Sequence, residues 1–254
     1  MSSSTTTSAA INDAPKFYDS ISDRYDKYYG HDPGLLAFIK SSLELLSPNA
    51  SVLDIGSGTG IPTFLSIVQS GRKLHGIDFS PAMISLSRTN VLGGTFELVD
   101  MLQYRPSQQF DAAFAIFSLF HFIREEMEIV AGKWRGWLFI GQSITDSYIL
   151  SCSTVLAEDM VGTTEEMYDE KRLAADNVPH RFMSQVFGNM LYTRKGWEKL
   201  LGDNGFEIGT AFLDYGEEGG VGLGDGDGEA RDGVGSREVG KMKVFGEGKS
   251  HGEE

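Results

Sequence analysis

Residues 52–60 have the sequence Val-Leu-Asp-Ile-Gly-Ser-Gly-Thr-Gly, and this stretch decides the fold of the chain. A short apolar run ends in a carboxylate, and glycines follow at alternate positions, which is typical of a buried strand that breaks into a tight turn. Glycine at such a turn tolerates a positive φ and lets the backbone approach a ligand closely. A helix from about residue 60 to residue 70 would direct its free N–H groups toward that ligand. The stretch therefore predicts a ligand-binding turn between a strand and a helix.

The spacing of these glycines distinguishes between classes of ligand. A dinucleotide-binding turn has the pattern Gly-x-Gly-x-x-Gly, whereas Ile61 stands where its third glycine would be. The Asp-x-Gly-x-Gly-x-Gly pattern of residues 54–60 instead resembles the first motif of the class I S-adenosylmethionine-dependent methyltransferases. A turn with a purely structural role is the alternative. The resemblance implies that S-adenosylmethionine is held at Asp54, Gly56, Ser57, Gly58 and Gly60.

A second predicted strand, residues 73–78, also ends in a carboxylate, that of Asp78. A nucleotide-binding βαβ unit places its ribose ligand at about this distance from the glycine turn. Ser80 can cap the next helix, which would have a proline as its first residue. The Asp-x-Ser-x-x-Met pattern resembles the ubiquinone/menaquinone branch of the family, which implies that Phe79 and Met83 line the adenine pocket. Alternatively, Asp78 only caps the helix and Met83 only fills the core.

Three further strands are predicted at residues 95–99, 110–117 and 137–141. Strands that alternate with helical patterns or long crossovers indicate an α/β fold with a doubly wound, mostly parallel sheet. The resemblance implies the Rossmann-like methyltransferase fold with seven strands, an N-terminal lid helix and a substrate-capping insertion. Family members usually enter the fifth strand through a Leu-Lys-Pro-Gly-Gly turn, which residues 133–137 replace here. By the same resemblance the cofactor is also bound at Asp100, Met101 and Phe117.

The lid helix and the insertion provide the predicted substrate pocket. Apolar and aromatic residues recur at helical spacing over residues 16–30, which resembles the lid helix of small-molecule methyltransferases. Either Tyr18 or Tyr25 would then face the methionine end of the cofactor, or both would only pack the helix onto the domain. The insertion, about residues 151–190, resembles that of fungal secondary-metabolite methyltransferases. We assign Tyr25 to the cofactor, and the substrate pocket to Tyr18, His31, His180, Phe182 and Met183.

The remaining sequence suggests how the chain is divided. Thr193 can cap a helix that ends near Asn204, and a strand is expected from residue 206 to residue 215. A final strand is weakly indicated at 241–245. The predicted divisions are a disordered leader (1–15), a methyltransferase domain (16–215), an acidic glycine-rich loop or tail (216–240) and a possible last strand with a tail (241–254).

Composition restricts the partners and the compartment. The formal net charge of −14 argues against nucleic-acid binding, and no apolar run reaches the ~20 residues of a membrane span. The single cysteine, Cys152, excludes a disulfide framework and indicates a reducing compartment. The polar N-terminus lacks a secretion signal. We therefore expect a cytoplasmic monomer or homodimer that acts on a small molecule.

The chemistry expected with this cofactor is methyl transfer to an oxygen or nitrogen nucleophile. His121, just beyond the fourth predicted strand, is the candidate general base, and the alternative is that it anchors the loop. No metal is expected, since residues 118–120 are Ser-Leu-Phe rather than clustered acids. Two other functions fit the same motifs: an enzyme that uses the cofactor for another reaction such as a cyclisation, and a non-catalytic regulator.

Overall fold

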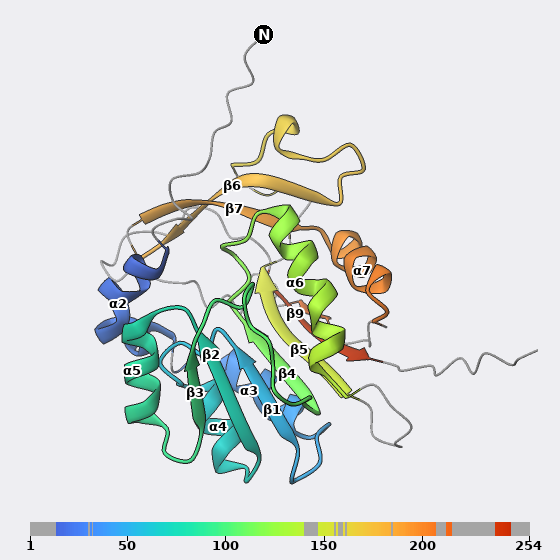
Figure 1. Cartoon of the computed structure of the whole chain (residues 1–254). Coiled ribbons are helices and arrows are strands. Elements are labelled where there is room, and N and C mark those ends of the chain that lie inside the picture. Colours follow the sequence, from blue (N-terminus) through green and yellow to red (C-terminus); the bar gives the residue numbers. More distant parts are fainter. Residues whose placement is uncertain are drawn as a thin grey trace, which may run out of the picture.

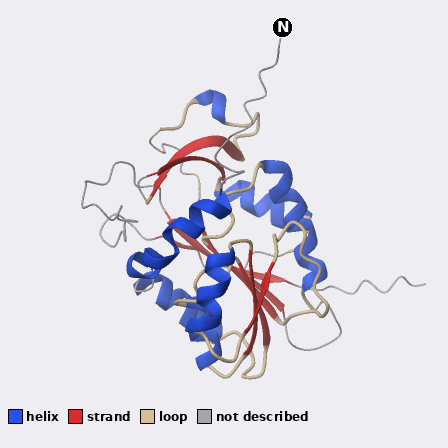
Figure 2. Ribbon diagram, turned by 60° about the vertical axis from the view of Figure 1, so that its left-hand side comes forward, coloured by secondary structure: helices blue, strands red, loops and turns tan. Residues whose placement is uncertain are grey.

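The computed structural model has one large sheet with helices on both of its faces (Figures 1 and 2). Its described residues are 14–29, 31, 33–139, 147–154, 156, 160, 162–183, 185–206, 212–214 and 237–244.

Five strands of the sheet run parallel, which confirms the predicted α/β class. They are β1 (Ser51–Ile55), β2 (Lys73–Asp78), β3 (Thr95–Leu98), β4 (Ala112–Ile116) and β5 (Ser147–Thr154). The order is β3-β2-β1-β4-β5, so the direction of strand succession reverses between β1 and β4. Ligands of open parallel sheets bind at such a reversal, outside the carboxyl ends of the strands.

The sheet continues beyond β5 with two antiparallel strands. The strand β9 (Arg237–Val244) pairs with β5, and β8 (Phe212–Asp214) pairs with β9. The strand β9 begins at Arg237, ahead of the predicted start at Lys241, and residue 245 lies outside the described residues. A strand from 206 to 215 was predicted, but Phe206 is in no strand, and residues 207–211 and 215 lie outside the described residues.

The two faces of the sheet are covered by different helices, and the alternation of the strands sorts the residues between them. In β1, Leu53 and Ile55 face the core formed with α6 (Arg124–Trp137) and α7 (Arg194–Asp203). Val52 faces the opposite core, formed with α3 (Pro33–Leu43) and α4 (Thr63–Gln69). These residues are fully buried, so β1 is a central strand.

The helix α2 (Ala14–Tyr29) and a small second sheet lie near the carboxyl ends of the parallel strands (Figure 1). The helix α2 packs against α5 (Pro81–Asn90), which runs beside β2 and β3. The strands β6 (Ala174–Phe182) and β7 (Gln185–Tyr192) form an antiparallel hairpin, preceded by the short 3-10 helix η1 (Glu165–Met167). The hairpin lies over the end of the sheet toward which the β5 arrow points.

Two predicted helix caps are confirmed. The Ser80 hydroxyl accepts from the Met83 amide at 3.1 Å at the start of α5, and Thr193 accepts from the Gly196 amide at 3.0 Å at the start of α7. The helix after the glycine turn, α4, begins at Thr63 rather than near residue 60.

The fifth parallel strand is β5, so the prediction of that strand at residues 137–141 is wrong in position. Trp137 is the last residue of α6, the expected turn at 133–137 is helical, and Leu138 forms an isolated parallel bridge with Phe110. Residues 140 and 141 lie outside the described residues. Trp137 continues the helical spacing of the buried residues in α6. The buried face of α6 consists of Met127, Val130, Ala131, Trp134 and Trp137.

Candidate cofactor and substrate site

The glycine turn connects β1 to the segment before α4 and is attached to β2. The amides of Gly56 and Ser57 both donate to the Ile77 carbonyl at 2.9 Å. Gly56, Gly58 and Gly60 all have positive φ, at 74°, 54° and 85°. The backbone of the turn therefore requires residues that tolerate the left-handed region.

The space around Gly56 differs from the space around Gly58. A Cβ built on Gly56 would lie 2.4 Å from the Cβ of Ser118, in the loop after β4. A Cβ built on Gly58 would meet no heavy atom within 4 Å. Gly56 therefore allows the loop after β4 to pack against the turn, whereas Gly58 borders open space.

Asp54 is the penultimate residue of β1 and Asp78 is the last residue of the neighbouring β2, and both are buried, with 2% and 7% of their surface exposed. Asp78 accepts from the Gly58 and Ser80 amides, each at 2.9 Å. Burial nevertheless raises the pKa of Asp78 to about 6. Burial, and then the charge of Asp78, raise the pKa of Asp54 to about 7. A ligand that donates hydrogen bonds would stabilise the ionised form of this pair.

Unsatisfied polar atoms lie beside the same turn. The hydroxyl oxygens of Ser57 and Ser118 are buried and have no hydrogen-bond partner among the described residues. Buried hydroxyls normally have a partner, and an exception calls for an explanation such as a missing ligand. Together with the open space at Gly58, these groups fit the hydroxyl, amino and carboxylate groups of S-adenosylmethionine.

Four more of the residues predicted to bind the cofactor fall in two places. Phe79 and Met83 lie at the end of β2 and in α5, and Met83 is buried against α2 residues. Asp100 and Met101 follow β3, next to β2, because the Val99 amide donates to the Asp78 carbonyl at 2.9 Å. The Asp100 carboxylate accepts from the Leu102 amide at 2.8 Å, and Met101 is 7% exposed in the core.

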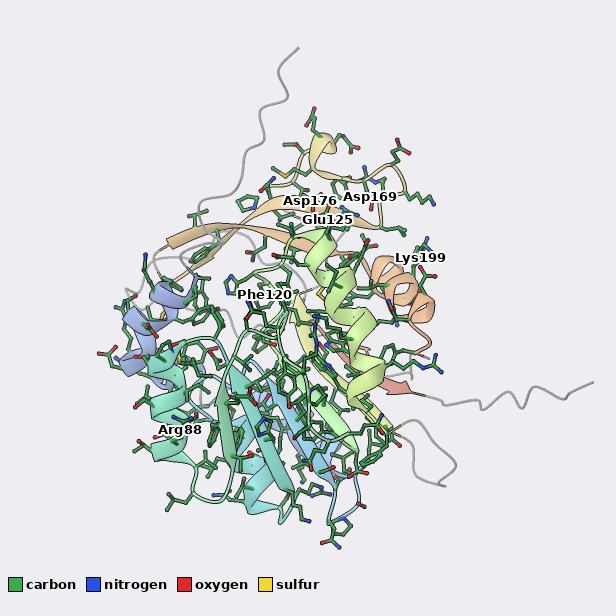
Figure 3. All side chains as sticks on the ribbon, in the orientation of Figure 1. Arg88, Phe120, Glu125, Asp169, Asp176 and Lys199 are labelled. Atoms are coloured by element: carbon green, nitrogen blue, oxygen red, sulfur yellow. The ribbon has the colours of Figure 1, made fainter. Side chains whose placement is uncertain are left out.

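Phe117, also predicted to bind the cofactor, follows β4 and has a φ of 51°. A left-handed backbone is rare for a residue with a large side chain, and such strain is often found at functional sites. The Phe117 ring stacks with that of Phe120 at 6.2 Å. Figure 3 shows Phe120 between the sheet and the β6–β7 hairpin.

The helix α2 is held over the site by two carboxylates that were not predicted. Asp19 accepts from the Ser80 hydroxyl at 2.5 Å and from the Ala82 amide at 3.1 Å, at the start of α5. Asp26 accepts from the Thr59 hydroxyl in the glycine turn. Both acids were visible on the polar face of the predicted helix, but their partners lie too far away in the sequence to be identified from it.

Tyr18 and Tyr25 of α2 lie above the ends of β2 and β4. The Tyr18 hydroxyl and His121 Nε2 are 2.7 Å apart, and their ring centroids are 5.2 Å apart. Tyr25 is near two carboxylates: burial, then the charges of Asp78 and Asp26, raise the pKa of its phenol. The structure thus brings the candidate base next to the predicted lid helix.

The other predicted pocket residues are distributed over the hairpin and the end of α2. Phe182 ends β6, with its ring 6.2 Å from that of Tyr18. Met183 has a φ of 49° in the hairpin turn and is 6% exposed in a cluster with residues of α2. His180 lies in β6, but its side chain is outside the described part of the structure. His31 is exposed and lies near Asp26. Burial raises the pKa of the Asp26 carboxyl, and the hydrogen bond from Thr59 and the nearby His31 partly offset this rise.

The hairpin region is joined to the main domain by ion pairs. Arg124, the first residue of α6, contacts Asp169 at 2.6 Å and Asp176 of β6 at 3.1 Å. Figure 3 shows Asp169 and Asp176 at the end of α6 that carries Glu125. The sequence contained no signal for this pairing, because the acids follow Arg124 at a distance that no local pattern explains.

Among the described residues, no three His, Cys, Asp or Glu side chains are grouped as ligands of a metal ion. Within the same residues, no helix is both long and apolar enough to cross a membrane.

Comparison with known proteins gives one family match and one curated relative. Residues 52–138 match a family described as "Methyltransferase domain". Arsenite methyltransferase from Halobacterium salinarum is 37% identical over 73 residues. That match covers 28% of this chain and 19% of the relative, so it spans about a fifth of the relative's length.

Solved structures resemble most of the chain. The 1,6-didemethyltoxoflavin-N1-methyltransferase of Burkholderia thailandensis, with S-adenosylhomocysteine and 1,6-didemethyltoxoflavin bound, has a TM-score of 0.63 at 12% identity. The similarity covers 93% of this chain and 88% of that chain. The (4+2)-cyclase SpnF has a TM-score of 0.58 at 17% identity, covering 80% of this chain and 75% of that chain. The chain therefore has the Rossmann-like α/β fold of the S-adenosylmethionine-dependent methyltransferases.

Proposed function

We propose that this protein transfers a methyl group from S-adenosylmethionine to an oxygen or nitrogen atom of a small molecule. The observation that carries the proposal is the glycine turn with its two buried carboxylates, Asp54 and Asp78, at the carboxyl ends of adjacent parallel strands. The methyltransferase match over residues 52–138 covers both carboxylates.

The chain's own residues divide the binding of the cofactor between them. Asp78 would accept from the ribose hydroxyls, because each of its oxygens keeps a lone pair beside its backbone bond. Asp100 and the Met101 amide would hold the adenine, and the open space at Gly58 would admit the chain of the cofactor. The remaining cofactor residues in this proposal are Tyr25, Asp54, Gly56, Ser57, Gly60, Phe79, Met83 and Phe117.

When bound, S-adenosylmethionine supplies an electrophilic methyl group. The chain has to orient the nucleophile, keep water out and accept a proton. His121 has a suitable position for accepting the proton, since its Nε2 already exchanges a hydrogen bond with the Tyr18 hydroxyl at 2.7 Å. The same bond also fits the alternative in which His121 anchors the loop after β4.

The parts around the core fold have proposed roles of their own. The helix α2 is the lid, and the β6–β7 region is the insertion that chooses the substrate through Tyr18, His31, His180, Phe182 and Met183. The aromatic and methionine side chains of α2 and the hairpin, clustered in the described part of the structure, support an apolar substrate. By resemblance to the ubiquinone/menaquinone branch and to fungal enzymes, we place the protein in cytoplasmic secondary metabolism, as a monomer or homodimer without nucleic-acid partners.

A cyclisation that uses the cofactor without methyl transfer is the second candidate. The observation in its favour is the structural similarity to the cyclase SpnF, at a TM-score of 0.58. The two functions predict different products, because only methyl transfer converts S-adenosylmethionine to S-adenosylhomocysteine.

The test uses the full chain with methyl-labelled cofactor and a panel of small hydroxyl- and amine-bearing compounds. Mass spectrometry should detect S-adenosylhomocysteine and a labelled product that is one methyl group heavier. If His121 is the base, His121→Ala should lower turnover by ~10²–10⁴-fold with little change in cofactor affinity. A folded protein that binds the cofactor, yields an isomerised substrate and leaves the label on the cofactor would contradict methyl transfer.

A further inference from the structure

The Tyr18 side chain packs against several aromatic side chains. Its ring centroid is 5.5 Å from that of Phe17, 6.0 Å from that of Phe79 and 6.2 Å from that of Phe182. The Phe17 and Phe79 rings meet it edge-on, at 74° and 75°, which is a favoured geometry for aromatic pairs. The space that Tyr18 occupies therefore suits a flat ring.

The hydroxyl of Tyr18 points to the group that is suited to accept a proton. It lies 2.7 Å from His121 Nε2, a normal distance for a hydrogen bond from a phenol. The side chains whose rings surround Tyr18 are Phe17, Phe79, Phe182, Tyr25 and His121. Since the phenol of Tyr18 itself lies in this space with its hydroxyl bonded to His121, the space accommodates a neutral ring that carries a hydroxyl.

The helix α2 does not depend on Tyr18 to stay in place. Asp19 holds it at the start of α5, and Asp26 holds it at the glycine turn. A rotamer change of Tyr18 would therefore expose the neighbouring aromatic rings and His121 while Asp19 and Asp26 keep the helix in place.

We propose that the acceptor is a phenol, and that Tyr18 occupies the position of its ring and hydroxyl when no acceptor is bound. This inference rests on the proposed function and adds a substrate class to it. The incoming phenol takes over the hydrogen bond to His121 Nε2, so that its oxygen is directed into the site and its proton toward the imidazole. Because the two phenols compete for one place, removing the Tyr18 hydroxyl favours the ligand.

The experiment compares two probes that differ only in a hydroxyl, 4-fluorophenol and fluorobenzene, by ¹⁹F NMR titration of the full chain. Both titrations are made with and without saturating S-adenosylhomocysteine. We expect 4-fluorophenol to bind more tightly than fluorobenzene. In Tyr18→Phe the affinity for 4-fluorophenol should rise about 2- to 10-fold, the effect of one neutral hydrogen bond that no longer competes. In His121→Phe the preference for the hydroxyl should disappear.

Tyr104→Phe is the matched control, since Tyr104 is a buried tyrosine whose ring packs on Trp137, and it should change neither affinity. Tyr18→Leu is a second variant in case Tyr18→Phe does not fold, and it should gain at least as much. Weaker or unchanged 4-fluorophenol binding in the folded Tyr18 variants would overturn the proposal, because it would show that Tyr18 is a wall of the site. Equal binding of the two probes to the unaltered chain would overturn it as well.

Different results would refute the phenol acceptor and the methyl transfer. Binding of S-adenosylhomocysteine without a preference for the phenol removes the substrate class and leaves methyl transfer in place. Phenol binding in a protein that does not bind S-adenosylhomocysteine contradicts the proposed function instead.

Discussion

Affinity for the cofactor should fall as the pH is lowered from 7 to 5, because Asp78 must be ionised to accept from both ribose hydroxyls. Burial raises the pKa of Asp78 to about 6. Its ionised fraction therefore drops from about nine-tenths at pH 7 to about one-tenth at pH 5, a loss of about tenfold in affinity or ~1.4 kcal/mol. Asp54, with a pKa raised to about 7, changes the affinity in the same direction. The α-amino and α-carboxyl groups of the cofactor keep their charges over this range.

Isothermal titration calorimetry with S-adenosylhomocysteine at pH 5, 6 and 7 measures this change. At pH 6, buffers with different ionisation heats should reveal protons released on binding. Asp78→Asn is the matched control, since the asparagine amide does not titrate. The affinity of this variant for S-adenosylhomocysteine should be lower at pH 7 and depend less on pH. Equal affinity at pH 5 and pH 7 in folded wild-type protein would refute the reasoning and exclude Asp78 as the group that must ionise.

Three further changes test the turn, the buried acid and the hairpin. Gly58→Val should abolish most cofactor binding at a stability cost of about 1–2 kcal/mol from its φ of 54°, whereas Gly56→Ala, which clashes with Ser118, should be less stable in thermal melts. Asp54→Asn should raise the stability of the ligand-free chain at pH 8 by roughly 2–4 kcal/mol. The raised pKa means that the ionised carboxyl destabilises the fold above pH 7, so the gain should shrink at pH 5; equal gains would contradict this. Arg124→Met removes two ion pairs and should cost about 1 kcal/mol or less, with faster limited proteolysis of the hairpin as the readout.

Local sequence patterns were sufficient to predict those parts of the site that are formed within one short segment of the chain. An apolar run that ends in Asp54, followed by glycines, predicts a strand and a turn with positive φ, because those backbone angles exclude most other residues. The caps at Ser80 and Thr193 were predictable for the same reason, since each bond joins residues three apart. Parallel strands followed from the alternation of strands and helices.

The sequence was misleading where a short apolar run is compatible with both a helix and a strand. The run at residues 137–141 was interpreted as a strand, yet Trp137 completes the buried face of α6 with Trp134. Only the packing of that face against the sheet decides between the two interpretations, because the local apolar density is the same for both.

The tertiary structure alone decided which residues meet at the proposed acceptor position. Tyr18 and His121 are 103 residues apart, and Asp19 is 61 residues from Ser80. The sequence by itself identified His121 and the helix that carries Tyr18, but it could not pair them. Their contact exists because α2 packs on α5 beside the end of β4, and that arrangement depends on the whole buried surface rather than on any local pattern.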